Sequence, residues 1–193
     1  MKKEKSLSKT DHNALPAKEK KKKSPWREAI ETIVWSLIIA LLIIHFVIQS
    51  FYIPSSSMEP TLVPGERVLV AKFYYRFTEP QRGDIVVFRY PIDNRKNLIK
   101  RVIGLPGEKI KISNGMIYVN GEPLQGDKFG RTYYDYGFYG EEEKTVPEDS
   151  YFVLGDNSIN SDDSRFWGYV PRKNILGRAF LIYWPLTHIS ILK

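Results

Sequence analysis

Three consecutive serines offer hydroxyl groups that could attack a carbonyl carbon, provided that a base removes the proton. They lie in the stretch FYIPSSSMEPTL, residues 51–62. The chain has three histidines, His12, His45 and His188, and no two of them have the spacing of a metal-binding pair. A zinc site is therefore not expected, and the sequence calls for no cofactor. A serine hydrolase that uses His188 as its base stays open.

Lysine is the other base available to a serine. Its ordinary pKa of about 10.4 is too high for this role near neutrality, but burial disfavours the charged form and lowers the pKa. Lys100 has apolar neighbours on both sides in NLIKRVIGLPG. In a strand, Lys100 and Val102 would share one face, and Ile99 and Arg101 the other. The alternative is an edge lysine that points to water, which is the usual situation of lysines.

Short β-type runs separated by turn residues predict the elements that must position these groups. Asn114-Gly115 lies between two alternating runs, the strongest short signal for a hairpin, and Asn120-Gly121 indicates a second turn. We therefore expect a mostly β fold, an antiparallel β domain over residues 54–193. The predicted strands are 67–73, 84–90, 98–104, 109–113, 116–119, 151–155 and 179–184. The Tyr-rich stretch 128–140 is expected to form a loop of undetermined role.

A long uncharged run precedes this domain. Residues 33–53 contain no Asp, Glu, Lys or Arg, and about 20 residues at ~1.5 Å each are enough to cross a hydrocarbon core of ~30 Å. The run is longer than the ~7–15 residues of a signal-peptide core and leads into bulky FYIP rather than a small-residue cleavage site. We therefore expect a single transmembrane helix over residues 30–53.

The net charge of +7 resides entirely in the N-terminal tail. Residues 1–27 hold ten basic and three acidic residues, and the charges of the remaining chain cancel. Positive charge beside a span favours the cytoplasmic side, so residues 1–29 are expected to form a disordered cytoplasmic tail in contact with membrane lipid. Nucleic acid is the alternative partner of such a tail and is not expected here. The absence of cysteine excludes disulfides and thiolate metal sites.

Four segments, PSSSMEPTL, GDIVVF, KRVIGLPGE and GDNSINSDDSRFWG, follow in this order behind the apolar run. Together they resemble the conserved boxes of type I bacterial signal peptidases. The resemblance implies that Ser57, the serine before the methionine, is the nucleophile and that Lys100 is the general base. It also implies that Ser55 contributes its side chain to the oxyanion hole, and it assigns no role to Ser56.

The last box supplies the supporting residues that the resemblance implies. Ser161 would hydrogen-bond and orient the lysine, and Asp163 and Arg165 would brace the site. These roles agree with the chemistry, because a carboxylate in direct contact with Lys100 would raise the pKa of the amine. Asp163 is therefore expected to pair with Arg165.

The resemblance also implies the substrate and the location. The enzyme would cleave signal peptides from secretory pre-proteins at the outer face of the cell membrane, after small residues at positions −3 and −1. The substrate would add as an extended strand to an exposed edge. The expected lining of the small-residue pockets is Ile53, Met58, Leu62 and Ile99.

A single span and a short region between Gly107 and Tyr151 resemble the compact enzymes of Gram-positive bacteria. Two other functions are alternatives to this one. A self-cleaving repressor would use the same pair of residues, but it would carry a DNA-binding domain where this chain has an apolar run. A non-catalytic β domain that binds exported polypeptides at the membrane would need neither Ser57 nor Lys100 as a reactive group.

Overall fold

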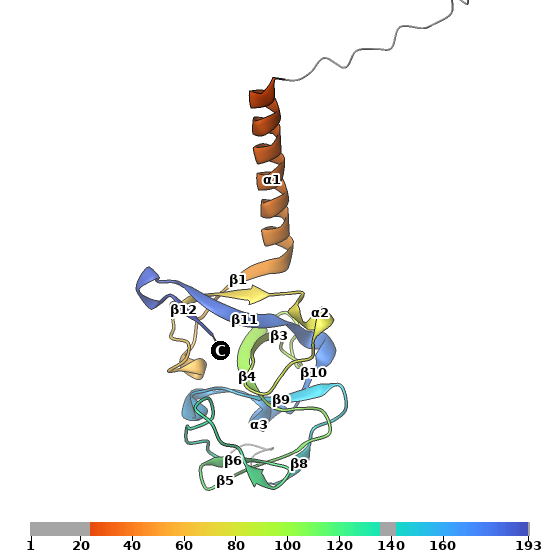
Figure 1. The fold of residues 1–193 in the computed structure, drawn as a ribbon. Helices are drawn as coiled ribbons and strands as arrows, with labels where there is room; N and C mark the ends of the chain where they lie inside the picture. Colours follow the sequence, from red (N-terminus) through yellow and green to blue (C-terminus); the bar gives the residue numbers. More distant parts are fainter. Residues whose placement is uncertain (1–23, 136–141, 193) are drawn as a thin grey trace, which may run out of the picture. The chain divides into compact units, whose positions relative to one another are not determined.

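The structure, a computed structural model, describes residues 24–135 and 142–192 (Figure 1). Most of the basic tail and residues 136–141 of the Tyr-rich stretch lie outside the described residues. The chain divides into two units, Met1–Ala40 and Leu41–Lys193, which are described separately here.

The first helix differs from the predicted transmembrane helix at both ends. Helix α1 spans Pro25–Val47, whereas the prediction was residues 30–53. Residues Ile48–Tyr52 form strand β1, which pairs with strand β2, Arg67–Ala71, in antiparallel register. The prediction was wrong for this segment, because the backbone groups of residues 48–52 pair with a neighbouring strand. In the part of the chain that the structure describes, no helix has the length and hydropathy of a membrane-spanning segment.

The described residues beyond the helix confirm a mostly β, antiparallel domain (Figure 1). Within them, the larger sheet has eight strands in the order β1-β2-β11-β3-β4-β9-β10, with β12 paired to β11. The other strands of this sheet are β3 Ile85–Arg89, β4 Asn97–Gly104, β9 Ser150–Leu154, β10 Val170–Pro171, β11 Ile175–Trp184 and β12 Ser190–Ile191.

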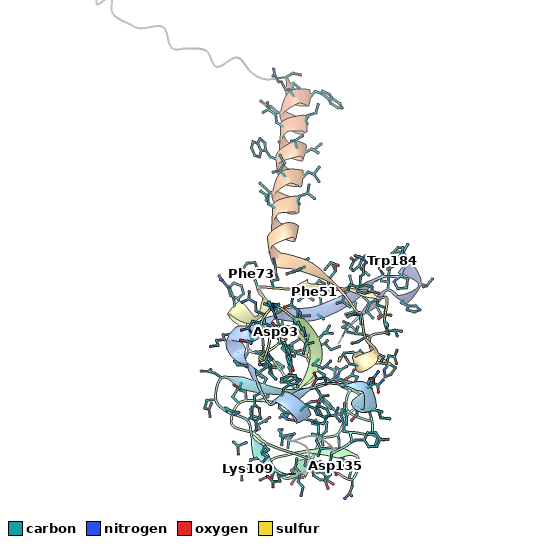
Figure 2. All side chains as sticks on the ribbon, turned by 180° about the vertical axis from the view of Figure 1, so that it is seen from behind. Phe51, Phe73, Asp93, Lys109, Asp135 and Trp184 are labelled. Carbon is teal, nitrogen blue, oxygen red and sulfur yellow. The ribbon has the colours of Figure 1, made fainter. Side chains whose placement is uncertain are left out.

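A smaller sheet of four strands among the described residues has the order β7-β6-β5-β8. Its strands are β5 Lys109–Ser113, β6 Met116–Val119, β7 Glu122–Pro123 and β8 Lys144–Thr145. Both predicted turns are present: Asn114 and Gly115, and then Asn120 and Gly121, all have positive φ. Figure 2 labels Lys109 at this end of the domain, and Phe51 and Trp184 at the opposite end.

Short helices complete the fold: α2 Tyr74–Phe77, α3 Ser164–Trp167, η1 Ser56–Met58, η2 Ser158–Asn160, η3 Arg172–Asn174 and η4 Leu186–His188. Apolar side chains gather in three buried clusters. The first cluster contains Ile53, Met58 and Leu62, so the segment that carries the three serines is fixed to the core on both sides of Ser57.

Candidate active site

Ser57 and Lys100, which are 43 residues apart in the chain, meet in the fold. Ser57 lies in the one-turn helix η1, and Lys100 lies in strand β4. The Nζ atom of Lys100 donates a hydrogen bond of 2.6 Å to Oγ of Ser57. This distance is within the range in which a base can take a proton from a nucleophile. The two residues that the sequence singled out are therefore in direct contact.

The strand geometry decides which way Lys100 points. Side chains alternate along β4, and Leu98 and Lys100 both line one cleft, whereas Ile99 packs against the first core cluster. Lys100 is only 3% exposed, so the alternative of a solvent-facing edge lysine is wrong.

The surroundings of Lys100 favour its neutral form. Burial and, to a smaller extent, the positive charge of Arg165 lower the pKa of the amine, to a net value of about 8. The carboxylates of Asp163, Asp162 and Asp156 act in the opposite direction and raise the pKa. Desolvation is the largest effect, and with a pKa of about 8 roughly a tenth of Lys100 is uncharged at pH 7.

The other two serines of the triplet differ in their surroundings. The Oγ atom of Ser55 lies 3.3 Å from Oγ of Ser57, and the Ser55 side chain is exposed to the cleft. Ser56 instead accepts a hydrogen bond of 2.5 Å from Nδ2 of Asn160. Ser55 is therefore placed to contact an oxygen that develops charge beside Ser57, while Ser56 joins two loops.

Ser161 lies at the site but does not make the expected contact. It lines the cleft together with Lys100, yet its buried Oγ has no hydrogen-bond partner among the described residues. Gly155 packs directly against it, because a Cβ at position 155 would lie 2.2 Å from Oγ of Ser161 and 2.4 Å from the carbonyl oxygen of Ser57. The role of Ser161 in orienting the lysine stays a prediction.

Asp163 and Arg165 form the expected pair. Both side chains are fully buried, and the guanidinium binds the carboxylate through Nε at 2.8 Å and Nη2 at 2.9 Å. Asp163 also accepts a hydrogen bond from the backbone N–H of Gly155, and Arg165 donates to Ser158. The pair thus fixes the loop of residues 155–161, whose Gly155 and Asn157 contact the carbonyl oxygen of Ser57.

A second buried ion pair was missed by the sequence reasoning. Arg101, the neighbour of Lys100, binds Asp156 through Nε at 2.8 Å and Nη2 at 2.6 Å. The hydroxyl of Thr61 donates to the same carboxylate. The signal was present in the sequence, because Arg101 and Asp156 lie inside two of the motifs that the resemblance rested on.

The residues expected to line substrate pockets lie elsewhere. Ile53, Met58 and Leu62 are buried in the first core cluster, and Ile99 packs against it. None of these four side chains lines the open cleft, which has a volume of about 570 Å³. Its apolar lining comes from Leu98, Ile159 and Phe166. That these four residues form pockets stays a prediction, and it requires the substrate to reach the core beneath Ser57.

His188 contacts Glu66 and not Ser57. Its Nδ1 lies 3.0 Å from a carboxylate oxygen of Glu66, its side chain is about half exposed, and it does not line the cleft. The open alternative of a Ser57–His188 pair is therefore not supported by the geometry.

Comparisons with known proteins show what this chain is similar to. The family model described as "Signal peptidase, peptidase S26" matches residues 26–184. The "Probable signal peptidase I-2" of Synechocystis is 44% identical over 93% of this chain and 85% of its own length. The "Signal peptidase I" of Leptolyngbya laminosa is 46% identical over 90% of this chain and 87% of its own length. A signal peptidase I crystal structure from Enterococcus faecalis is 34% identical and covers 52% of this chain and 97% of its own, with a TM-score of 0.42.

Both of the relatives named first are cyanobacterial. The narrower expectation of a Gram-positive subtype is therefore not specifically supported. The matched family model spans most of the chain and includes Ser57, Lys100 and the loop of residues 155–165. This chain belongs to the signal peptidase family, peptidase S26.

Proposed function

We propose that this protein is a membrane-anchored serine endopeptidase that removes N-terminal signal peptides with Ser57 as nucleophile and Lys100 as general base. One observation carries the residue roles: the amine of Lys100 is buried and lies 2.6 Å from the hydroxyl of Ser57. Membership of the family supplies the substrate class.

The reaction begins when neutral Lys100 takes the proton of Ser57 while Oγ attacks the carbonyl carbon of the scissile peptide bond. The carbonyl oxygen acquires negative charge, and the hydroxyl of Ser55 donates a hydrogen bond to it. Lys100, now protonated, gives its proton to the leaving nitrogen as the C–N bond breaks. The mature protein departs with a new amino terminus, and the signal peptide stays bound to Ser57 as an ester.

Hydrolysis of the ester repeats the same steps with water as the nucleophile. Lys100 takes a proton from the water as its oxygen attacks the ester carbonyl, and it returns the proton to Oγ of Ser57. The enzyme is regenerated, and the signal peptide leaves with a new carboxylate. One amine thus serves as base and acid in both halves, which requires a pKa close to the working pH.

An open strand edge offers a binding site for the substrate backbone. Strand β4 pairs with β3 from Asn97 to Arg101, but its pairing with β9 begins only at Arg101. The second edge of residues 97–100 therefore has no partner strand among the described residues, and Leu98 and Lys100 of this segment line the cleft. An extended substrate can form main-chain hydrogen bonds with this edge, which places a peptide bond beside Lys100 and Ser57. Small residues at −3 and −1 would let the chain approach closely.

The N-terminal segment supports a location at the membrane. No residue between Thr32 and Tyr52 is charged, and the large apolar side chains of α1 are exposed within the described structure (Figure 2). We place the basic tail on the cytoplasmic side and the β domain on the outer side, where signal peptides present their cleavage sites. Alkaline carbonate extraction of membranes tests this placement, because an anchored protein stays in the pellet and a peripheral one is released.

The decisive experiment for the reaction compares four purified proteins acting on a secretory pre-protein in detergent. Ser57→Ala removes the nucleophile and is expected to abolish cleavage. Lys100→Met keeps the shape of the side chain without the amine, and is expected to lower kcat/KM by at least about 10²–10⁴-fold, the contribution of a general base. His188→Ala is the control and is expected to cleave like the wild type.

The outcomes separate the competing functions. Cleavage that survives Lys100→Met would assign the base to another residue. Wild-type protein that binds pre-proteins without cleaving them would favour a non-catalytic β domain. If His188→Ala loses activity while Lys100→Met retains it, His188 would be the base for Ser57.

A further inference from the structure

Two neighbouring aspartates of the loop beside the active site have opposite surroundings. Asp163 is fully buried, pairs with Arg165 and caps helix α3 by accepting from the backbone N–H of Arg165. Asp162 is exposed and lines the cleft together with Ser57 and Lys100. Among the described residues, Asp162 has no hydrogen-bond or ion-pair partner. The helix cap and the buried ion pair therefore do not depend on Asp162.

The charge of Asp162 acts against the proposed base. It raises the pKa of Lys100, as do Asp163 and Asp156. The carboxylates of Asp163 and Asp156 are each bound by an arginine, whereas no cation binds Asp162 among the described residues. Replacing this carboxylate with a neutral group would make Lys100 a more available base. Because no described side chain binds this exposed charge, it is available to groups that enter the cleft.

Asp162 differs from the other residues that line the cleft because it is charged and exposed. The other cleft residues are Ser55, Leu98, Ile159, Asn160, Ser161 and Phe166, all uncharged. Lys100 points its amine at Ser57 and is buried. Asp162 is thus the exposed charged group of this lining, and a substrate bound along the open edge of β4 passes close to it.

From this placement we infer that Asp162 selects substrates by charge, favouring a cationic side chain and disfavouring a carboxylate at the residues that flank the scissile bond. The inference rests on the proposed function and adds a second criterion to the small residues at −3 and −1. Residues −2, +1 and +2 are the positions concerned, because the side chains at −3 and −1 are limited in size. The Asp162 carboxylate attracts a substrate lysine and repels a substrate glutamate. Both effects increase the ratio of kcat/KM between a lysine substrate and a glutamate substrate.

The test uses peptide substrates that differ only by Lys or Glu at −2, +1 or +2, cleaved by the full-length enzyme in detergent. We expect wild type to prefer lysine about threefold to tenfold in kcat/KM at one or more of these positions, since exposed charge pairs contribute modestly. The preference should shrink at 1 M salt, where the screening length is about 3 Å. In Asp162→Asn the preference should fall to within about twofold of unity.

Asp127→Asn is the matched control, because it changes the net charge equally at an exposed aspartate that does not line the cleft. It should keep the wild-type preference. Equal lysine-to-glutamate ratios in wild type and Asp162→Asn at all three positions would overturn the inference while leaving the proposed function intact. A wild type that cleaves none of the peptides, including an uncharged one, would instead contradict the proposed function.

Discussion

The small sheet and the catalytic edge of the large sheet are built on different principles. Strands β5 and β6 alternate exposed and buried residues around an Asn-Gly turn, and their inward side chains join one apolar cluster. At the catalytic edge, buried polar groups come from three separate segments: Ser57, the Lys100–Arg101 pair and the loop of residues 155–165. None of the buried polar or charged residues in the described chain belongs to β5–β8.

We therefore expect the small sheet to contribute mainly to stability and the catalytic edge mainly to activity. Apolar burial in the small sheet lowers the free energy of the folded state and needs no particular partner geometry beyond close packing. Buried charges at the catalytic edge contribute little to stability unless each is paired. Their arrangement instead controls the pKa of one amine. Substitutions in the two regions should therefore change different measurements.

After Ser57→Ala and Lys100→Met, the largest effect on activity at the catalytic edge is expected for Ser55→Ala. Loss of one oxyanion-hole donor typically lowers kcat by about 10²–10³-fold, and the exposed side chain of Ser55 makes no core contact. The melting temperature should stay at the wild-type value. Steady-state cleavage of a pre-protein and a thermal melt of the same sample measure both. A fall in kcat of less than about threefold would show that the oxyanion is stabilised by other groups.

The pH profile is expected to follow Lys100. Because burial lowers the pKa of the amine to about 8 and the base must be neutral, kcat/KM should fall about tenfold for each pH unit below 8 and level off above it. By the same linkage, this group makes the folded state more stable as the pH rises above 8, where the unfolded chain binds more protons. A profile that is flat between pH 6 and 8 would contradict the role of Lys100.

In the small sheet, Ile117→Ala is expected to lower the free energy of unfolding by about 2–5 kcal/mol, because it leaves a cavity in a packed core. The wild-type side chain is only 2% exposed. Activity per folded molecule should stay within about twofold of wild type. Urea unfolding and active-site titration measure the two quantities, and Ile92→Ala, at a side chain that is 71% exposed, is the control. A large change in kcat would show that the two regions are coupled.

The smallest effect is expected for Gly115→Ala in the β5–β6 turn. The backbone φ of +78° is unfavourable for alanine, and its Cβ would lie 3.1 Å from Cγ2 of Thr132. A loss of about 1 kcal/mol in the free energy of unfolding should follow, with unchanged activity. Gly130→Ala is the matched control, since Gly130 has no positive φ and its Cβ would meet only one atom, at 3.9 Å. Equal stability of the two variants would contradict the strain argument.

The sequence was most informative where local patterns decide the structure. Alternation and the Asn-Gly turn predicted strands 109–113 and 116–119 with the observed bounds. The burial of Lys100 was predicted from its apolar neighbours together with the resemblance, and the structure confirms it. The pairing of Asp163 with Arg165 was implied by the resemblance and agreed with the need to keep a carboxylate away from the amine, and the structure shows the pair.

Long-range contacts account for what the sequence did not predict. Residues 48–52 read as a continuation of the apolar helix, because uncharged residues suit a helix and a strand equally, and only pairing with β2 decides between them. The lining of the cleft by Ile159 and Phe166 depends on how the loop of residues 155–165 folds back. The local pattern around Met58 and Leu62 could not show whether these side chains face the substrate or the core.

The close packing of Gly155 against the carbonyl oxygen of Ser57 sets an order of events during biosynthesis. The backbone N–H of Asn157 donates to that same oxygen at 3.0 Å. Ser57 therefore makes these contacts only after a segment about a hundred residues downstream has been synthesised and has packed against it. Until then, Ser57 of the growing chain lacks its contacts with Gly155 and Asn157.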